Sequence, residues 1–160
     1  MIREAGGKPF AWKVGHAYIK PKMQEYDAVF GGEVSGHYYF KDFWFADCGL
    51  LTGLTILAYV SQLGEKLSTK IIQLEDRYHI SGEINSRVPD VEAVLQRIKR
   101  TYHDAEIDEL DGVAVRYPDW HFVVRLSNNE PLVRLTLEAD SQANMSKRRD
   151  ELLALIRENR

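Results

Sequence analysis

The glycine-rich segment Gly31-Gly32-Glu33-Val34-Ser35-Gly36-His37 gathers the side chains of this sequence best suited to binding a polar ligand. It follows the apolar residues Ala28-Val29-Phe30, and glycines let the backbone take positive φ and approach a ligand closely. An extended backbone would point Glu33 and Ser35 the same way. A carboxylate accepts hydroxyl protons and a serine donates or accepts, so the pair suits a polyhydroxylated ligand. A polar turn with one solvated acid explains the segment equally well.

A second polar segment, Arg125-Leu126-Ser127-Asn128-Asn129-Glu130-Pro131, joins two predicted strands. Strand alternation places Arg125 and Ser127 on one side, and the amides of Asn128 and Asn129 follow. A guanidinium binds two phosphate oxygens at once, while neutral donors and backbone N–H groups occupy the rest. The segment is thus a candidate phosphate cradle. A polar hairpin with asparagine in left-handed turn positions is the commoner use of such residues.

The elements expected before residue 75 alternate between strands and helices, which indicates a parallel or mixed α/β sheet. Residues 2–5 resemble the end of a helix and residues 67–74 a segment crossing between two halves. The beginning of the chain therefore suggests a fragment with an incomplete sheet edge and exposed apolar surface, which would invite self-association. The other expected elements are a strand at 8–14, a helix at 17–26, a strand at 28–30 and an apolar helix at 47–63.

The elements expected after residue 75 follow the order βαβββα, which is typical of a compact α+β domain. Residues 89–102 carry apolar side chains at helical spacing, and Val133, Leu135 and Leu137 alternate as in a half-buried strand. The full set is a strand at 78–88 with a polar interruption, a helix at 89–102, strands at 113–115, 121–126 and 132–138, and a helix at 141–159.

Composition limits the classes of function. The chain has 160 residues, 44% of them hydrophobic, and a net charge of −3, so it offers no basic footprint for nucleic acid or an anionic membrane. The apolar run from Cys48 to Val60 is too short to span a bilayer. Cys48 is the single cysteine, which indicates a reducing, cytoplasmic setting, and we expect it to be a buried small hydrophobe.

The polar segments resemble the motifs of one enzyme family. Residues 31–37 are similar to the sugar-binding loop Gly-Glu-Met-Ser-Gly-His of the α-D-phosphohexomutases, in their phosphomannomutase/phosphoglucomutase branch, with Val34 in place of Met. Residues 125–131 resemble their phosphate-binding loop Arg-x-Ser-Asn-Thr-Glu-Pro, with Asn129 in place of Thr. Residues 12–16 (Trp-Lys-Val-Gly-His) resemble a Thr-Gly-His turn of the family. Asn128 favours this branch over the phosphoglucosamine branch.

The resemblance implies a fold and an activity. These isomerases have four domains around one cleft and move a phosphoryl group between O1 and O6 of a hexose through a bisphosphorylated sugar. Residues 1–74 would correspond to most of domain 3, a truncated mixed α/β domain. Residues 75–160 would correspond to domain 4, a TATA-binding-protein-like βαβββα fold.

The resemblance also implies roles for individual residues, with mannose or glucose phosphate as the ligand. The loop in the first half would hold the sugar hydroxyls, and the loop in the second half would grip the phosphate that is not being transferred. His16, as a side chain that titrates near neutrality, is a candidate for proton transfer. The residues carried over are Glu33, Ser35 and His37 for the hydroxyls, and Arg125, Ser127, Asn128 and Asn129 for the phosphate.

Two family motifs do not occur in this sequence: the phosphoserine motif Thr-x-Ser-His-x-Pro and the magnesium loop Asp-Gly-Asp-Gly-Asp-Arg. Phosphoryl transfer needs a positioned donor and charge neutralisation. We therefore expect a carboxy-terminal fragment that is inactive by itself, with Mg²⁺ bound elsewhere in the full-length enzyme. Glu33 and His37 alone are poor evidence for a metal site, so we expect this chain to bind no metal.

Two other interpretations fit the same residues. A free-standing sugar-phosphate-binding or regulatory module would use both loops without chemistry. A structural α/β domain with chance turns would bind no hexose phosphate and would be unaffected by Arg125→Ala.

Overall fold

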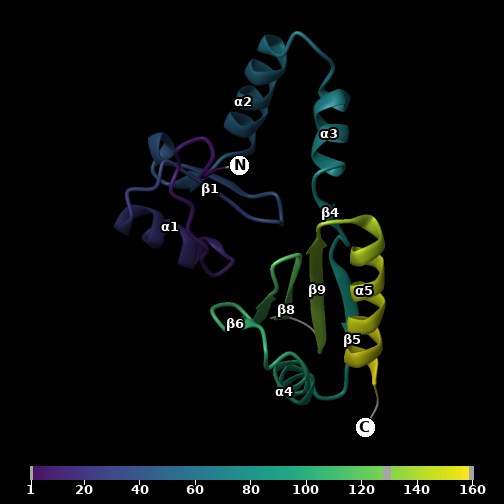
Figure 1. Cartoon of the computed structure of the whole chain (residues 1–160). Coiled ribbons are helices and arrows are strands. Elements are labelled where there is room, and N and C mark those ends of the chain that lie inside the picture. Colours follow the sequence, from purple (N-terminus) through teal and green to yellow (C-terminus); the bar gives the residue numbers. More distant parts are fainter. Residues whose placement is uncertain (1, 128–130, 159–160) are drawn as a thin grey trace. The chain divides into compact units, whose positions relative to one another are not determined.

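The structure, a computed structural model, describes residues 2–127 and 131–158. The chain divides into two compact units, unit 1 with residues 1–67 and unit 2 with residues 68–160, and Figure 1 shows their elements along the chain. Each unit is described by itself below. Within the described residues, no helix combines the length and the apolar character needed to cross a bilayer.

Unit 1 contains a small antiparallel sheet with strand order β1-β2-β3. The alternation of strands and helices in the sequence predicted a parallel or mixed sheet, whereas the described strands of unit 1 pair antiparallel. The glycine segment is a short hairpin, and parallel strands need a crossover connection of a dozen or more residues. Residues 8–14 form no strand, and residues 2–6 form turns. The elements are α1 (His16–Glu25), β1 (Phe30–Gly32), β2 (Tyr38–Phe40), the 3₁₀ helix η1 (Lys41–Phe43), β3 (Ala46–Asp47) and α2 (Gly49–Gln62).

Glycine is favoured at two positions of the 31–37 segment, each for a different structural reason. A Cβ on Gly31 would lie 2.8 Å from the sulfur of Met23, a buried residue of α1, so glycine allows β1 to pack closely against that helix. Gly36 has φ +86°, which favours glycine because other residues rarely adopt positive φ. The hairpin is thus fixed by one packing contact and one turn.

Helix α2 and the residue before it differ from expectation. Cys48 is half-buried and caps α2, since its sulfur accepts a hydrogen bond from the Leu51 N–H at 3.4 Å; it is not the buried hydrophobe that we expected. None of the residues of α2 is buried, and Leu50 is 75% exposed. The segment at 67–74, expected as a crossing segment, is helix α3 (Leu67–Glu75).

Unit 2 confirms the α+β fold predicted for the second half. Its sheet has the order β4-β9-β8-β7-β6, with β5 also paired to β9, and all of its ladders are antiparallel. Strand β6 was not predicted, because its three residues carry one apolar side chain between two acids. The elements are β4 (His79–Ile80), β5 (Ile84–Arg87), α4 (Val91–Thr101), β6 (Glu106–Asp108), β7 (Val113–Arg116), β8 (Trp120–Leu126), β9 (Leu132–Ala139) and α5 (Gln142–Arg157).

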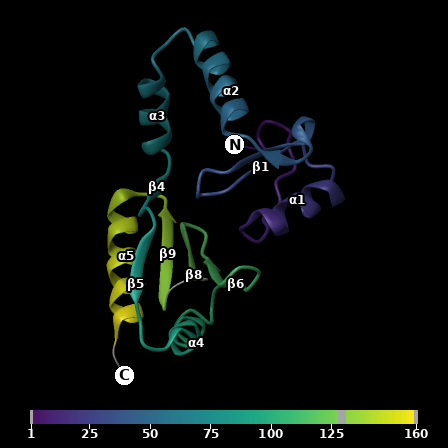
Figure 2. The ribbon, with the colours of Figure 1, turned by 180° about the vertical axis from the view of Figure 1, so that it is seen from behind.

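The core of unit 2 lies between this sheet and helices α4 and α5. Val133, Leu135 and Leu137 of β9 are at most 1% exposed, as their alternation predicted. They belong to one cluster that includes Ile98 of α4 and Leu152 of α5. Figures 1 and 2 both show α5 running alongside β5 and β9. The face of β8 and β9 opposite the core is left for polar side chains.

Candidate functional site

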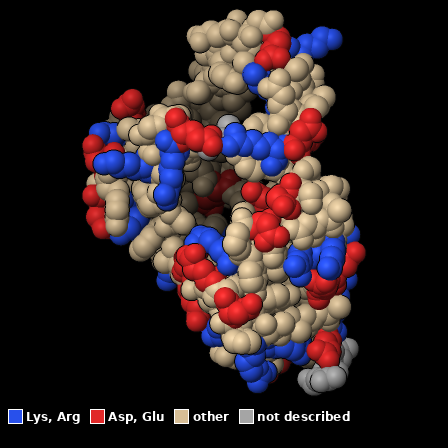
Figure 3. All heavy atoms as spheres, in the orientation of Figure 1, with Lys and Arg blue, Asp and Glu red and all other residues tan. Residues whose placement is uncertain are grey.

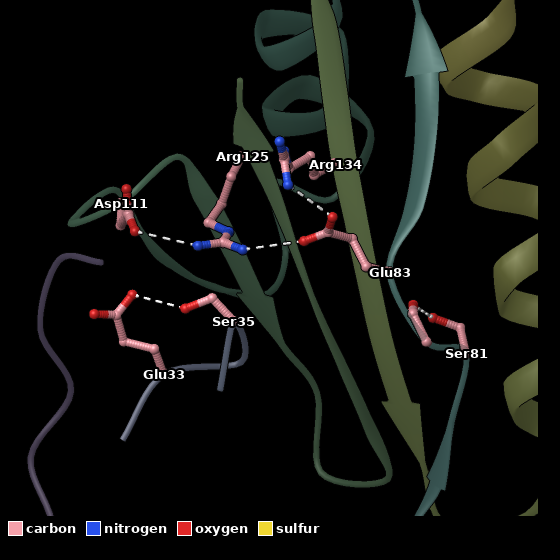
Figure 4. A network of polar contacts seen from close by, with 8 residues as sticks. Glu33, Ser35, Ser81, Glu83, Asp111, Arg125 and Arg134 are labelled. Carbon is pink, nitrogen blue, oxygen red and sulfur yellow. Dashed lines mark hydrogen bonds and ion pairs between the residues drawn. The ribbon is translucent and has the colours of Figure 1, made fainter. Parts of the chain in front are cut away.

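The hairpin between β1 and β2 brings together Glu33 and Ser35, two of the three side chains predicted to bind the sugar. The Glu33 N–H donates to the His37 carbonyl at 2.9 Å, and the Gly36 N–H donates to the Glu33 carbonyl at 3.0 Å. The Ser35 hydroxyl donates to Glu33 Oε2 at 3.1 Å, as Figure 4 shows. A carboxylate and a hydroxyl therefore lie side by side on an exposed turn.

Tyr39 lies beneath this hairpin and was missed in the sequence. Its side chain is fully buried, and its hydroxyl donates to Glu33 Oε1. Burial, and then the hydrogen bond to Glu33, raise the pKa of Tyr39 well above its usual value, so the hydroxyl stays a donor at neutral pH. Because Tyr39 faces the same side of β2 as His37, strand alternation would have pointed to it.

A second polar group forms around Asp47. His16 Nε2 lies 2.8 Å from Asp47 Oδ1, and His37 Nδ1 lies 2.8 Å from Asp47 Oδ2. The His16 ring also packs edge-on against the ring of Tyr39, with centroids 5.0 Å apart. The hydrogen bond from His37, with the nearby charges of both imidazoles, holds the pKa of the Asp47 carboxyl below its usual value. We call these three residues the His–Asp–His cluster.

The His–Asp–His cluster gives two imidazoles one shared, ionised partner. A carboxylate that accepts from a histidine fixes the orientation of the ring and favours one tautomer. Such a pair can exchange a proton with a ligand oxygen that comes within hydrogen-bond distance. The sequence placed His16 and His37 in separate motifs. Asp47 had no motif, and only its pairing with Tyr39 in the β2–β3 ladder would have revealed it.

The predicted phosphate segment is described in part. Arg125 lies near the end of β8, and the Ser127 N–H donates to the Leu132 carbonyl at 3.0 Å, closing the β8–β9 hairpin. Asn128 and Asn129, which we predicted to complete the cradle, lie outside the described residues. Among the described residues of this segment, Arg125 is the one that carries a charge.

Arg125 is held between two acids. Its guanidinium lies 3.4 Å from a Glu83 oxygen and 3.8 Å from an Asp111 oxygen, and Figure 4 shows it between them. Gly112 has φ +84°, and a Cβ there would lie 2.3 Å from the Val124 carbonyl oxygen. Only glycine allows this close approach of β7 to β8, which brings Asp111 beside Arg125.

A second arginine lies next to the first. Arg134 is directly opposite Arg125 in the β8–β9 ladder, and it donates to the same carboxylate, Glu83, at 2.9 Å. Two guanidinium groups therefore lie on neighbouring strands with Glu83 bound to both. Arg134 belongs to no motif in the sequence, and its role follows from its place opposite Arg125 and its contact with Glu83.

The surface beyond these groups carries mixed charge. On the face seen in Figure 3, basic and acidic side chains lie interspersed, without a large area of one sign. On that face, then, a small ligand held by a few charged groups fits better than a polyanion.

Comparisons with known proteins agree with these features. Residues 1–78 match the family model described as phosphoglucomutase/phosphomannomutase, alpha/beta/alpha domain III. Residues 83–155 match that of the phosphoglucomutase/phosphomannomutase C-terminal domain. A solved phosphoglucomutase/phosphomannomutase family protein from Burkholderia thailandensis superposes with a TM-score of 0.78 at 32% identity, covering 97% of this chain and 33% of that one.

Curated relatives cover nearly the whole chain. Phosphohexose mutases of Xanthomonas campestris pv. campestris are 40% identical over 160 residues, which is 98% of this chain and 36% of the relative. A phosphomannomutase of Escherichia coli is 36% identical, covering 98% of this chain and 35% of its own length. One from Methanocaldococcus jannaschii is 38% identical, with 98% and 34% covered. The chain thus spans about a third of the length of these relatives.

Proposed function

The chain belongs to the phosphoglucomutase/phosphomannomutase family, and from this premise we propose that it is the substrate-recognition part of a hexose phosphate isomerase. The complete enzyme would interconvert hexose 1-phosphate and hexose 6-phosphate through a bisphosphorylated sugar. The observation that carries the proposal is the presence of both recognition loops in one chain, a carboxylate–hydroxyl pair in unit 1 and an arginine-based loop in unit 2. The domain boundary near residue 74 and a cytoplasmic setting belong to the same proposal.

The first loop supplies acceptors for sugar hydroxyls. Glu33 has about four lone-pair positions, of which the Tyr39 and Ser35 hydroxyls use two. About two remain for a ligand, and Ser35 can accept as well as donate. His37, whose Nδ1 faces Asp47, has its Nε2 left for a third contact. We propose that Glu33, Ser35 and His37 bind hydroxyl groups of the hexose.

The second loop supplies the cation for the phosphate. Arg125 offers five N–H donors in a planar fork, and its contacts to Glu83 and Asp111, at 3.4 and 3.8 Å, are long. A phosphate would form shorter, bidentate bonds, with Ser127, Asn128 and Asn129 as neutral donors. Glu83 and Asp111 oppose an anion, so we expect weak binding by this chain alone.

The proton chemistry of the complete enzyme would involve the His–Asp–His cluster. We propose that His16, oriented by Asp47, assists proton transfer at a ligand oxygen. The ionised Asp47 stabilises a protonated imidazole, which is the form that a general acid needs.

Magnesium enters the proposal as an ion of the complete enzyme. The acid-rich segment at residues 108–112 is the part of this chain most like a magnesium loop, but its groups are already engaged. Asp108 Oδ1 accepts from the Leu110 N–H at 2.9 Å, and Asp111 contacts Arg125. These residues do not fit the near-octahedral oxygen site that Mg²⁺ requires.

Titration calorimetry with glucose 1-phosphate and with mannose 1-phosphate tests the proposal. We expect weak binding that Arg125→Ala and Glu33→Ala each weaken by at least about tenfold, because each loses charge-assisted hydrogen bonds worth about 1.5–3 kcal/mol. The binding of inorganic phosphate should be weakened by Arg125→Ala and unchanged by Glu33→Ala.

Matched controls are Arg116→Ala and Glu25→Ala, which remove the same charges at exposed ion pairs, Arg116 with Glu106 and Glu25 with Lys22. Both should bind like the unaltered chain. Equal losses in the controls, or binding unaffected by Arg125→Ala, would contradict the assignment of the two loops.

A further inference from the structure

The His–Asp–His cluster presents three metal-ligating side chains that converge on one point of unit 1. The ligand atoms of His16, His37 and Asp47 all lie within 4.8 Å of one another. We propose that this cluster is a binding site for a transition-metal dication of the Zn²⁺ class. The site shares His37 with the sugar loop and His16 with the proposed proton transfer, and no part of the proposed isomerase reaction requires it to be filled.

The donor set defines the kind of ion. Two imidazole nitrogens with one carboxylate oxygen suit Zn²⁺, Co²⁺ and Ni²⁺, whereas Mg²⁺ and Ca²⁺ favour all-oxygen sites. Three protein ligands leave the fourth position of a tetrahedral ion for water. The cluster is thus selective by chemistry against the magnesium expected of the complete enzyme.

The geometry requires a small adjustment. Ligand atoms around a tetrahedral Zn²⁺ are about 3.3 Å apart, given bonds of about 2.0–2.1 Å. The two histidine nitrogens now lie 2.8 Å from different oxygens of Asp47, so each of these pairs would open by about half an ångström to admit the ion. We expect rotation of the three side chains to provide this change.

The surrounding elements hold the three side chains in place. Asp47 is opposite Tyr39 in the β2–β3 ladder, and His37 precedes β2 on the same face, so they are diagonal cross-strand neighbours. His16 begins α1 and packs against the buried ring of Tyr39. A sheet and a buried aromatic ring therefore form a rigid base for the site.

The site is open to solvent, which gives an ion a route in. The side chains of His16 and His37 are 51% and 50% exposed, and that of Asp47 is 30% exposed. Glu33, which we considered with His37 as a metal pair in the sequence, takes no part, since Tyr39 and Ser35 bind its carboxylate. The proposal departs from the expectation that this chain binds no metal, because it depends on Asp47.

Calorimetry with ZnCl₂ and the visible absorption of added Co²⁺, both on the full chain in phosphate-free buffer, test the site. We expect one ion per chain, d–d bands typical of tetrahedral Co²⁺, and no detectable Mg²⁺ binding. His37→Gln and Asp47→Asn should each weaken binding by at least about tenfold, since even outer partners of metal ligands contribute 10–100-fold.

Two control variants test whether Zn²⁺ binding is specific to the His–Asp–His cluster. His103→Gln in unit 2 and Asp42→Asn in η1 remove the same groups outside the cluster and should leave Zn²⁺ binding unchanged. Paramagnetic Co²⁺ added to the unaltered chain should broaden the amide resonances of residues 16, 37 and 47 first, which needs no variant to fold. Failure to bind Zn²⁺, equal binding by His37→Gln and Asp47→Asn, or broadening centred elsewhere would overturn the proposal.

Discussion

Both units contain many apolar residues, but they bury these residues to different extents. Unit 2 closes a continuous core between its sheet and two helices. In the described part of unit 1, Met23 and Tyr39 are the buried hydrophobic residues, and the apolar helix α2 exposes Leu54 by 54% and Leu57 by 66%. An apolar pattern therefore predicts burial only where the same chain supplies the covering surface.

The difference extends to the candidate sites. In unit 2, Arg125 and Arg134 lie on strands whose other faces are anchored in the core. In unit 1 the polar groups gather around Tyr39, the one buried ring among the described residues of that unit. We infer that unit 2 provides stability and that the site in unit 1 depends on a few specific contacts.

The largest effect should come from the core of unit 2. Phe122 is fully buried, and Phe122→Ala should lower the free energy of unfolding by about 3–5 kcal/mol. Leu54→Ala on α2 should change it by no more than about 0.5 kcal/mol. Urea unfolding followed by circular dichroism measures both. A comparable loss from Leu54→Ala would remove the contrast between the units.

The second-largest effect, on the local stability of β1 and β2, should come from a substitution of Tyr39. Tyr39→Phe removes the hydrogen bond to the Glu33 carboxylate, and bonds to charged groups contribute about 1.5–3 kcal/mol. Hydrogen exchange of the β1 and β2 amides should become faster by a factor of about ten or more, while β8 and β9 stay unchanged. The matched variant is Tyr117→Phe in unit 2, whose hydroxyl bonds to exposed Asp104; exchange in β1 and β2 should not respond to it.

Exposed apolar residues on α2 should produce self-association. Side chains left in contact with water gain from burial against a second copy. Figure 3 shows the surface formed by α2 as mostly uncharged. Leu54→Glu with Leu57→Glu should weaken the association by about tenfold or more, as measured by sedimentation velocity. A monomer at all concentrations in the unaltered chain would contradict this prediction.

The smallest effect should be a pH dependence in unit 2. The Tyr117 hydroxyl lowers the pKa of Asp104, so this contribution to stability is present above the unfolded pKa near 3.8 and is lost as the pH falls through the lower folded value. Burial raises the pKa of Tyr117 to about 12, so its contribution is present below pH 10 and is lost between pH 10 and 12. Tyr117→Phe should flatten the stability profile at both ends, as measured by thermal unfolding across pH.

Sequence reasoning succeeded where local patterns and tertiary structure agree. The amphipathic pattern at 89–102 predicted α4, and alternation at 132–138 predicted β9 with its buried face. It failed where distant residues meet. The acidic partner of Arg125 is Glu83, which precedes β5 and lies 42 residues away in the chain, and Asp47 joins two histidines that lie 21 residues apart in the chain. Spacing along one segment carries no information on such contacts.

Amide resonances followed during a titration with glucose 1-phosphate test the central claim, that both loops bind a hexose phosphate. We predict that amides of residues 33–37 and amides of residues 125–127 both shift. Arg125→Ala should remove the shifts at residues 125–127, and Arg116→Ala should preserve them. Shifts confined to one loop, or shifts at residues 125–127 that survive Arg125→Ala, would contradict the account.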